Sequence, residues 1–152
     1  MEQDRVERTV HIAATTERVW DILTKPEHIG HWFGRGTPAT VDLRPDGVMV
    51  LEPGPHGERY LARVVKVDPP HYLAYRWASG YPDVLADDTN STLVEFHVSA
   101  DGEKTRLTVC ESGFASLTIP AGRERFASYK SHSQGWTEVI RNIADYVEQG
   151  PS

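Results

Sequence analysis

The sequence of 152 residues contains a single cysteine, Cys110. One thiol cannot form an internal disulfide, and a single cysteine is too few for a zinc site built from several cysteines. Cys110 lies in the strand-like pattern TRLTVCES, where a lone cysteine is more often a small buried residue than a nucleophile. The chain is therefore expected to depend on an ordinary apolar core, and its length suits one domain over residues 1–152.

Long apolar runs and basic clusters are missing as well. No segment approaches the roughly 18 continuous apolar residues that span a bilayer, and the polar start MEQDRVER lacks the apolar core of a signal peptide. The 16 Lys and Arg residues are outnumbered by 22 Asp and Glu residues, which gives a formal net charge of −6. A protein surface that binds the phosphate backbone of a nucleic acid needs clusters of Lys and Arg, and the sequence has none. We expect a cytoplasmic protein with no membrane span and no nucleic-acid partner.

The sequence also lacks the common catalytic and cofactor motifs. It contains no Gly-x-Ser-x-Gly, no phosphate-binding loop and no dinucleotide fingerprint. His28 and His31 are three residues apart and could present two ligands to one metal, but no third ligand stands nearby. The remaining histidines are scattered, and His132 is expected at the surface like the others. We therefore predict no metal and no cofactor.

What the sequence does contain is a clear order of secondary structure. Alternating apolar residues predict a strand over 6–12, and helical spacing then predicts a short helix capped by Thr15 or Thr16, with a second helical turn from Pro26. Three pairs of strands should follow, each folded back at a tight turn. In the first of these turns, Gly47 is expected to adopt a positive φ. The strand pairs are expected over 39–53, 58–78 and 91–112.

The last part of the chain predicts one long amphipathic helix. Its apolar face should carry Tyr129, Ser133, Trp136, Ile140, Ile143 and Val147, and Gly150 with Pro151 should end it. Gly135 lies inside this helix, where glycine costs about 1 kcal/mol relative to alanine, so we expect it to permit a close backbone approach. Between two strand pairs, Ser79 to Asn90 shows no periodicity and is either a lid or a disordered insertion.

An antiparallel sheet with one apolar face needs a cover, and the C-terminal helix is the available one, so the sheet should curl around it. This order, with the segments ERVWDILTKPEHIGHWFG, VVKVDPPHYLAYRW, LTVCESGF and GWTEVIRNIADYV, resembles the START-like or SRPBCC superfamily. Within it, the chain is similar to the family related to the activator of the ninety-kilodalton heat-shock protein ATPase, the Aha-type domain. The resemblance extends from about Val6 to Val147.

The resemblance implies an α+β, helix-grip (START-like or Bet v-like) fold. In that fold a curved antiparallel sheet wraps around a long C-terminal helix, two short helices follow the first strand, and a deep, largely apolar cavity remains. Many members of the superfamily bind hydrophobic molecules in the cavity, and a minority catalyse reactions there.

Strand alternation indicates which side chains would face such a cavity. We take Tyr75 and Trp77 as inward on one strand, Phe96 on the next, and Val109 with Glu111 on the one after. The alternative is that the same side chains merely fill a core. The predicted ligand-binding residues are Trp32, Phe33, Tyr60, Tyr75, Trp77, Phe96, Val109, Glu111, Phe114, Phe126, Tyr129 and Trp136.

Glu111 is the most informative polar residue among them. A carboxylate that faces the apolar side of a sheet is costly unless it is paired or wet. Glu111 could orient a polar group of a ligand or act as a general base, or it could lie at the exposed end of its strand. His97 follows Phe96 and should face outward.

The leading functional hypothesis is the binding of a small hydrophobic or amphipathic molecule, with no catalytic residue assigned. One alternative is a cyclase, dehydratase or hydrolase that uses Glu111 or Tyr75 as an acid or base. Another is a chaperone ATPase co-factor, which would expose a broad apolar patch. The partners considered are thus a small hydrophobic molecule, a chaperone and a second copy of the chain.

Overall fold

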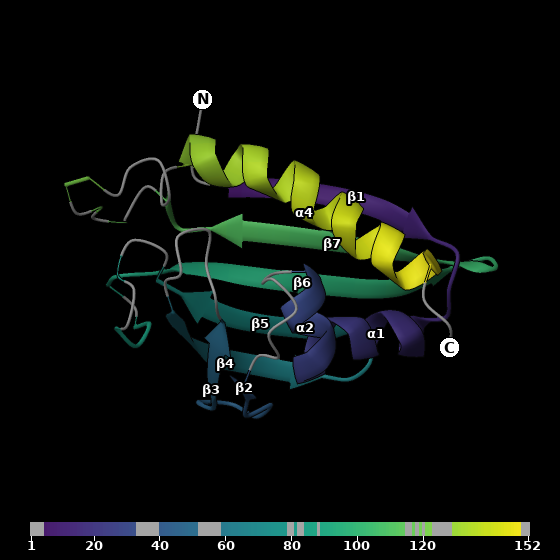
Figure 1. Cartoon of the computed structure of the whole chain (residues 1–152), viewed down its shortest axis with the longest axis horizontal. Helices are drawn as coiled ribbons and strands as arrows, with labels where there is room; N and C mark the ends of the chain where they lie inside the picture. The colour runs from purple at the N-terminus through teal and green to yellow at the C-terminus, as the bar shows by residue number, and fades with distance from the viewer. Residues whose placement is uncertain are drawn as a thin grey trace.

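A computed structural model describes residues 5–32, 40–51, 59–78, 81, 84–87, 89–114, 117, 119, 121–122 and 129–149. Within these residues, three helices lie on one face of a sheet (Figure 1). The helices are α1 (Thr16–Thr24), α2 (Pro26–Trp32) and α4 (Tyr129–Gln149). The strands are β1 (Arg5–Ile12), β2 (Thr40–Val41), β3 (Val48–Leu51), β4 (Tyr60–Asp68), β5 (Tyr72–Trp77), β6 (Thr92–Asp101) and β7 (Lys104–Ser112).

The sheet has seven strands in the order β1-β7-β6-β5-β4-β3-β2, and every neighbouring pair is antiparallel. Consecutive strands from β2 to β7 are neighbours, whereas β1 joins the sheet beside β7. Figure 1 shows α4 lying along β1 and β7, with α1 and α2 beside the C-terminal part of α4. The predicted α+β architecture, with two short helices after the first strand and a long helix on the sheet, is confirmed.

Helix α1 begins and ends where its sequence directs. Thr15 is the N-cap, and its hydroxyl accepts a hydrogen bond from the amide of Arg18 at 3.1 Å. Lys25 ends the helix in an extended conformation, which suits the residue before a proline, and Pro26 begins α2. The prediction of a cap at Thr15 or Thr16 is therefore resolved in favour of Thr15.

The turn between β2 and β3 differs from the expectation in its detail. The residue with a positive φ is Asp46, at 66°, and not Gly47. Aspartate tolerates this conformation. Glycine is required at position 47 for another reason, because there is no room for a side chain. A Cβ atom on Gly47 would lie 2.0 Å from the carbonyl oxygen of Asp42. The sequence thus predicted the turn correctly but assigned the wrong reason to its glycine.

The inward faces of the central strands agree with the predicted alternation. One row across the sheet joins residues of five neighbouring strands, all of them buried: Val64, Tyr75, Val94, Glu111 and Val6. The adjoining row contains Leu73, Phe96 and Val109, which are also buried. His97 is exposed, as expected, and Cys110 is buried among the residues of the opposite face.

Helix α4 buries the predicted apolar face, including Trp136, Ile140, Ile143 and Val147. The expectation for Gly135 is wrong, because among the described residues nothing lies within 4 Å of the position that its Cβ would take. The backbone there is not in close approach to another element. The predicted end of the helix at Gly150 and Pro151 lies outside the described residues.

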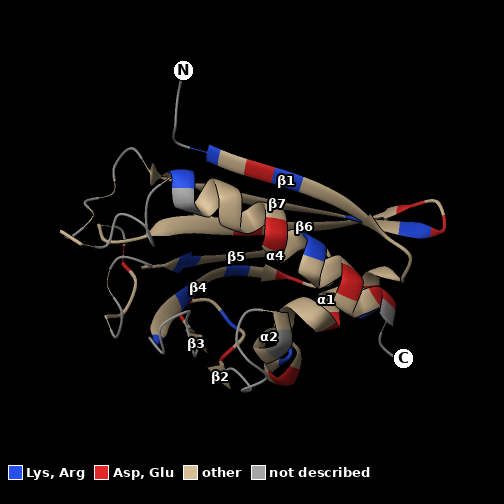
Figure 2. Cartoon of the chain, turned by 45° about the horizontal axis from the view of Figure 1, so that its top comes forward, with Lys and Arg blue, Asp and Glu red and all other residues tan. Residues whose placement is uncertain are grey.

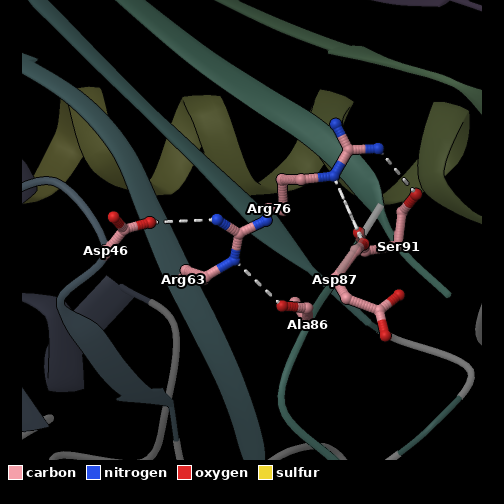
Figure 3. A network of polar contacts seen from close by, with 6 residues as sticks. All are labelled: Asp46, Arg63, Arg76, Ala86, Asp87 and Ser91. Atoms are coloured by element: carbon pink, nitrogen blue, oxygen red, sulfur yellow. Dashed lines mark hydrogen bonds and ion pairs between the residues drawn. The ribbon is translucent and has the colours of Figure 1, made fainter. Parts of the chain in front are cut away.

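The segment between β5 and β6 is attached to the sheet through several of its described residues. Figure 3 shows Arg63 between Asp46 and the carbonyl oxygen of Ala86, and Arg76 bonded to Ser91. The amide of Ala86 also donates to the carbonyl oxygen of Leu61 in β4, at 3.0 Å. The choice between a lid and a disordered insertion over Ser79–Asn90 depends on residues outside the described ones.

Charged residues of both signs lie along α4, as Figure 2 shows. The exposed charged residues of the helix include Lys130, Glu138, Arg141, Asp145 and Glu148. Within the described ranges, no helix is long and apolar enough to cross a bilayer.

Candidate functional site

Glu111 lies near the end of β7 and is completely buried, with 0% of its surface exposed. The alternative that it lies at an exposed strand end is therefore wrong. Its side chain points between the sheet and α4, because residues of both contact it. A carboxylate at such depth requires hydrogen-bond donors on all sides.

Four donors surround the Glu111 carboxylate. Oε1 accepts from Nδ1 of His132 and Nε1 of Trp136, both at 2.7 Å and both from α4. Oε2 accepts from Nε1 of Trp77 in β5 at 2.8 Å and from the hydroxyl of Thr92 in β6. Glu111 therefore links three strands of the sheet to one helix.

This environment decides the protonation state of the carboxyl group. Burial on its own would raise the pKa of Glu111. The electrostatic attraction of His132 and the hydrogen bonds that the carboxylate accepts outweigh burial, so the pKa of Glu111 lies below its ordinary range. Glu111 is thus ionised at neutral pH.

The geometry limits what Glu111 can do chemically. A carboxylate offers about four lone-pair directions, and four donors occupy both oxygens here. A general base needs a lone pair directed at the substrate proton. Glu111 instead fixes the orientation of the His132 ring and holds α4 against the sheet.

Aromatic side chains surround this buried pair in two groups. In one group, the ring of Phe96 lies 5.9 Å from Trp136, 6.2 Å from Trp32 and 6.3 Å from Tyr75, centroid to centroid. In the other group, the ring of His132 lies 5.3 Å from Trp77 and 5.4 Å from Phe114. Tyr60 extends the second group through Trp77, and Tyr129 extends it through Phe114.

The structure thus brings together most of the residues that the sequence predicted for a site. Tyr75, Trp77, Phe96, Glu111 and Trp136 converge on the inner face of the sheet. Val109 is buried in the same row as Phe96. Trp32 also belongs to the group, and its Nε1 donates to the carbonyl oxygen of Ile22 at 2.8 Å. Phe33 and Phe126 lie outside the described residues.

Two polar members of the site were missed. His132 was expected at the surface but is 6% exposed, and Thr92 was not considered. His132 stands four residues before Trp136 in α4, so it shares the inward face of the helix. The helical spacing could therefore have identified it, whereas only the fold places Thr92 beside Glu111.

The histidine pair of α2 does not form a metal site with its surroundings. Nδ1 of His28 lies 2.7 Å from the hydroxyl of Tyr146 in α4, which makes it a contact between helices. The side chain of His31 lies outside the described residues. In the described part of the chain, no group of three potential ligands surrounds a point where a metal would fit.

A hollow of about 560 Å³ lies near the C-terminal end of α4, away from the aromatic groups. Residues 13–15, α1 and the end of α4 line it. Several of its polar atoms are bonded to one another: the Glu148 carboxylate accepts from the amide of Ala13 at 2.8 Å, and Arg18 donates to the carbonyl oxygen of Val147 at 3.5 Å. None of the predicted site residues that the structure describes borders this hollow, so we place the candidate site around Glu111 instead.

Comparison with solved structures shows a shared fold. DynU16, from the dynemicin biosynthetic locus, has a TM-score of 0.74 and 24% identity over 97% of this chain and 48% of its own length. This chain therefore spans about half of DynU16. Protein MLL2253 from Mesorhizobium loti has a TM-score of 0.74 and 19% identity, with coverage of 97% and 99%. The Aha1 dimer from Colwellia psychrerythraea has a TM-score of 0.70 and 14% identity, with coverage of 97% and 98%.

Sequence comparison assigns the family. No curated protein matches the chain significantly. The family described as "Activator of Hsp90 ATPase homolog 1-like protein" matches residues 13–148, which is most of the sequence. The chain therefore belongs to this Aha1-like family of the START-like (SRPBCC) superfamily.

Proposed function

We propose that the protein binds a small, largely apolar molecule between the inner face of the sheet and the first half of α4. In this proposal the whole chain, residues 1–152, acts as one cytoplasmic domain. The observation that carries the proposal is the convergence of aromatic side chains from the sheet and the helix around one buried carboxylate. A mainly apolar wall with a few fixed polar groups is typical of small-molecule sites.

The distribution of residual exposure supports this location. Trp32, Phe114 and Trp136 each keep 8% of their surface exposed, and Tyr75 keeps 4%. The aliphatic residues of the same face, such as Val94 and Val109, keep none. Part of the surface that solvent reaches on this side of the sheet therefore belongs to aromatic rings, and the ring of Phe96 at their centre is fully buried. A ligand there would contact ring faces and edges, which favour flat or cyclic apolar groups.

The chaperone alternative has less support from this chain. It requires a broad exposed apolar patch. In the described ranges, the exposed large apolar side chains are Val65 of β4 with Val84 and Leu85 of the following connection. Leu85 also pairs with Leu61 of β4 through a parallel bridge. Three such residues form a small area, and the aromatic residues lie on the other face of the sheet.

A fluorescent ligand tests the proposal directly. N-phenyl-1-naphthylamine is neutral and brightens when it leaves water, so titration should show saturable binding to the purified protein. Trp77→Leu should weaken this binding about tenfold, because Trp77 is only half-buried and joins Tyr60 to His132. Extraction of freshly purified protein followed by mass spectrometry should identify neutral apolar compounds that co-purify.

Trp20→Leu is the matched control. Trp20 is a buried tryptophan of α1, and it is not part of either aromatic group. Its replacement should lower stability without changing the affinity for the dye. If both variants change the affinity equally, or if the wild-type protein shows no saturable binding, the proposed function is wrong.

A further inference from the structure

The hydroxyl of Tyr75 stands out among the polar groups on the inner face. Tyr75 is 4% exposed, and its hydroxyl makes no hydrogen bond to any residue in the part of the chain that the structure describes. A buried hydroxyl without a partner has lost its bonds to water and gained none in exchange. Such a group calls for a partner that the described residues do not supply.

Other polar groups of comparable side chains are satisfied. The indole nitrogens of Trp32, Trp77 and Trp136 each donate to an oxygen of the protein. On the opposite face of β5, the hydroxyl of Tyr72 donates to Glu95 at 2.5 Å. The fold therefore provides acceptors for these aromatic groups. At Tyr75, by contrast, the described residues offer no acceptor for the hydroxyl.

We propose that Tyr75 donates a hydrogen bond to a neutral carbonyl oxygen of the bound molecule, and that the site prefers such compounds to carboxylates. The inference rests on the proposed function and names the chemical class of its ligand. It assigns the apolar part of the molecule to the rings around Phe96, because Phe96 contacts Tyr75, Trp32 and Trp136.

The charge of Glu111 explains why the acceptor should be neutral. Tyr75 and Glu111 occupy the same row of the sheet, with Val94 of β6 between them. A carboxylate ligand at Tyr75 would give up its hydration in an apolar surrounding. It would also lie in the same row as the charge of Glu111, which already holds His132 as its partner. Burial, and then the charge of Glu111, raise the pKa of Tyr75, so its hydroxyl keeps the proton that it donates.

Three small probes of almost the same shape separate these effects. Acetophenone carries a neutral carbonyl oxygen, α-methylstyrene replaces that oxygen by a methylene group, and benzoate carries a carboxylate. Each probe would compete with N-phenyl-1-naphthylamine for the wild-type protein. Acetophenone should bind about tenfold more tightly than α-methylstyrene, which is the effect of one hydrogen bond in a dry site, and benzoate should compete least.

Tyr75→Phe removes only the hydroxyl and should abolish the preference for acetophenone while leaving the affinity for α-methylstyrene unchanged. Tyr72→Phe, on the opposite face of the same strand, should keep the preference. If the dye binds but the wild-type protein prefers neither neutral probe, or if Tyr75→Phe keeps the preference, this inference is overturned while the proposed function stands. If benzoate competes best, the charge argument is wrong. If the dye itself does not bind, both proposals fail.

Discussion

The two halves of α4 are held to the rest of the molecule by different forces. In the first half, residues 129–137, His132 and Trp136 donate to the carboxylate of Glu111. On the same half, Arg8 of β1 donates to Ser133 and Thr137. In the second half, residues 138–149, the buried residues are apolar: Ile140, Ile143, Ala144 and Val147.

The second half is also enclosed by more helices. Tyr146 contacts His28 of α2, and Val147 accepts a hydrogen bond from Arg18 of α1. Apolar packing is non-directional and excludes water by shape alone. The buried hydrogen bonds of the first half instead converge on the charge of Glu111, whereas the hydrogen bonds of the second half are exposed or only part-buried. The difference indicates that the second half is structural core and the first half is the place where a ligand could contact the helix.

Removing the Glu111 side chain tests this comparison most strongly. Glu111→Ala leaves His132, Trp136, Trp77 and Thr92 without their acceptor in a buried place. We expect the free energy of unfolding to fall by about 4 kcal/mol, as when one partner of a buried charged pair is removed. Chemical denaturation monitored by tryptophan fluorescence measures this loss of unfolding free energy relative to the wild type.

Glu95→Ala is the control for Glu111→Ala. Glu95 lies one strand away on the opposite face and accepts a hydrogen bond from Tyr72. Because this pair is only half-buried, its loss should cost about 1 kcal/mol or less. Equal losses in the two variants would show that Glu111 does not organise the first half of α4.

The second half of α4 should respond to a smaller side chain in another way. Ile143 is 0% exposed, so Ile143→Ala should lower the free energy of unfolding by about 3 kcal/mol through lost burial and a cavity. Under conditions in which the variant is still folded, its affinity for N-phenyl-1-naphthylamine should equal that of the wild type. A large loss of affinity would mean that the ligand also depends on the second half.

The predictable parts of this molecule are those that depend on local patterns. Thr15 caps α1 and Pro26 begins α2 because caps and prolines act within a few residues. The alternation Val109, Glu111 on β7 predicted which side chains face α4, because the strand period is two. These rules need no knowledge of what lies opposite.

What the sequence could not predict depends on contacts between distant elements. Glu111 remained ambiguous between a buried site and an exposed strand end, because its donors come from two other strands and a helix. The prediction for His132 rests on the scatter of the histidines along the sequence and takes no account of its place on the inward face of α4. Gly135 was expected to mark a close approach, but glycine in a helix does not reveal its surroundings.

Acid should weaken the first half of α4 before the second. The pKa of Glu111 is lower in the folded protein than in the unfolded chain, so its ionisation stabilises the fold above its ordinary pKa. This contribution should be lost as pH falls through the lowered value. The difference in the free energy of unfolding between wild type and Glu111→Gln should therefore be larger at about pH 7 than at about pH 3. The decrease should amount to part of the loss expected for Glu111→Ala. The difference in the free energy of unfolding between wild type and Ile143→Ala should not change with pH. If both differences respond to pH in the same way, ionised Glu111 does not stabilise the first half of α4.

The smallest effect concerns the backbone of the first half. Since nothing among the described residues lies within 4 Å of a Cβ at position 135, Gly135→Ala should raise the free energy of unfolding by about 0.5–1 kcal/mol through helix propensity. Gly102→Ala is the matched control, because its φ of +63° disfavours alanine, and it should lower stability by about 1 kcal/mol. Thermal and chemical denaturation of both variants measure these changes in stability. A loss of stability in Gly135→Ala would mean that the first half of α4 is constrained by close packing like the second, and the contrast between the halves would then rest on Glu111 alone.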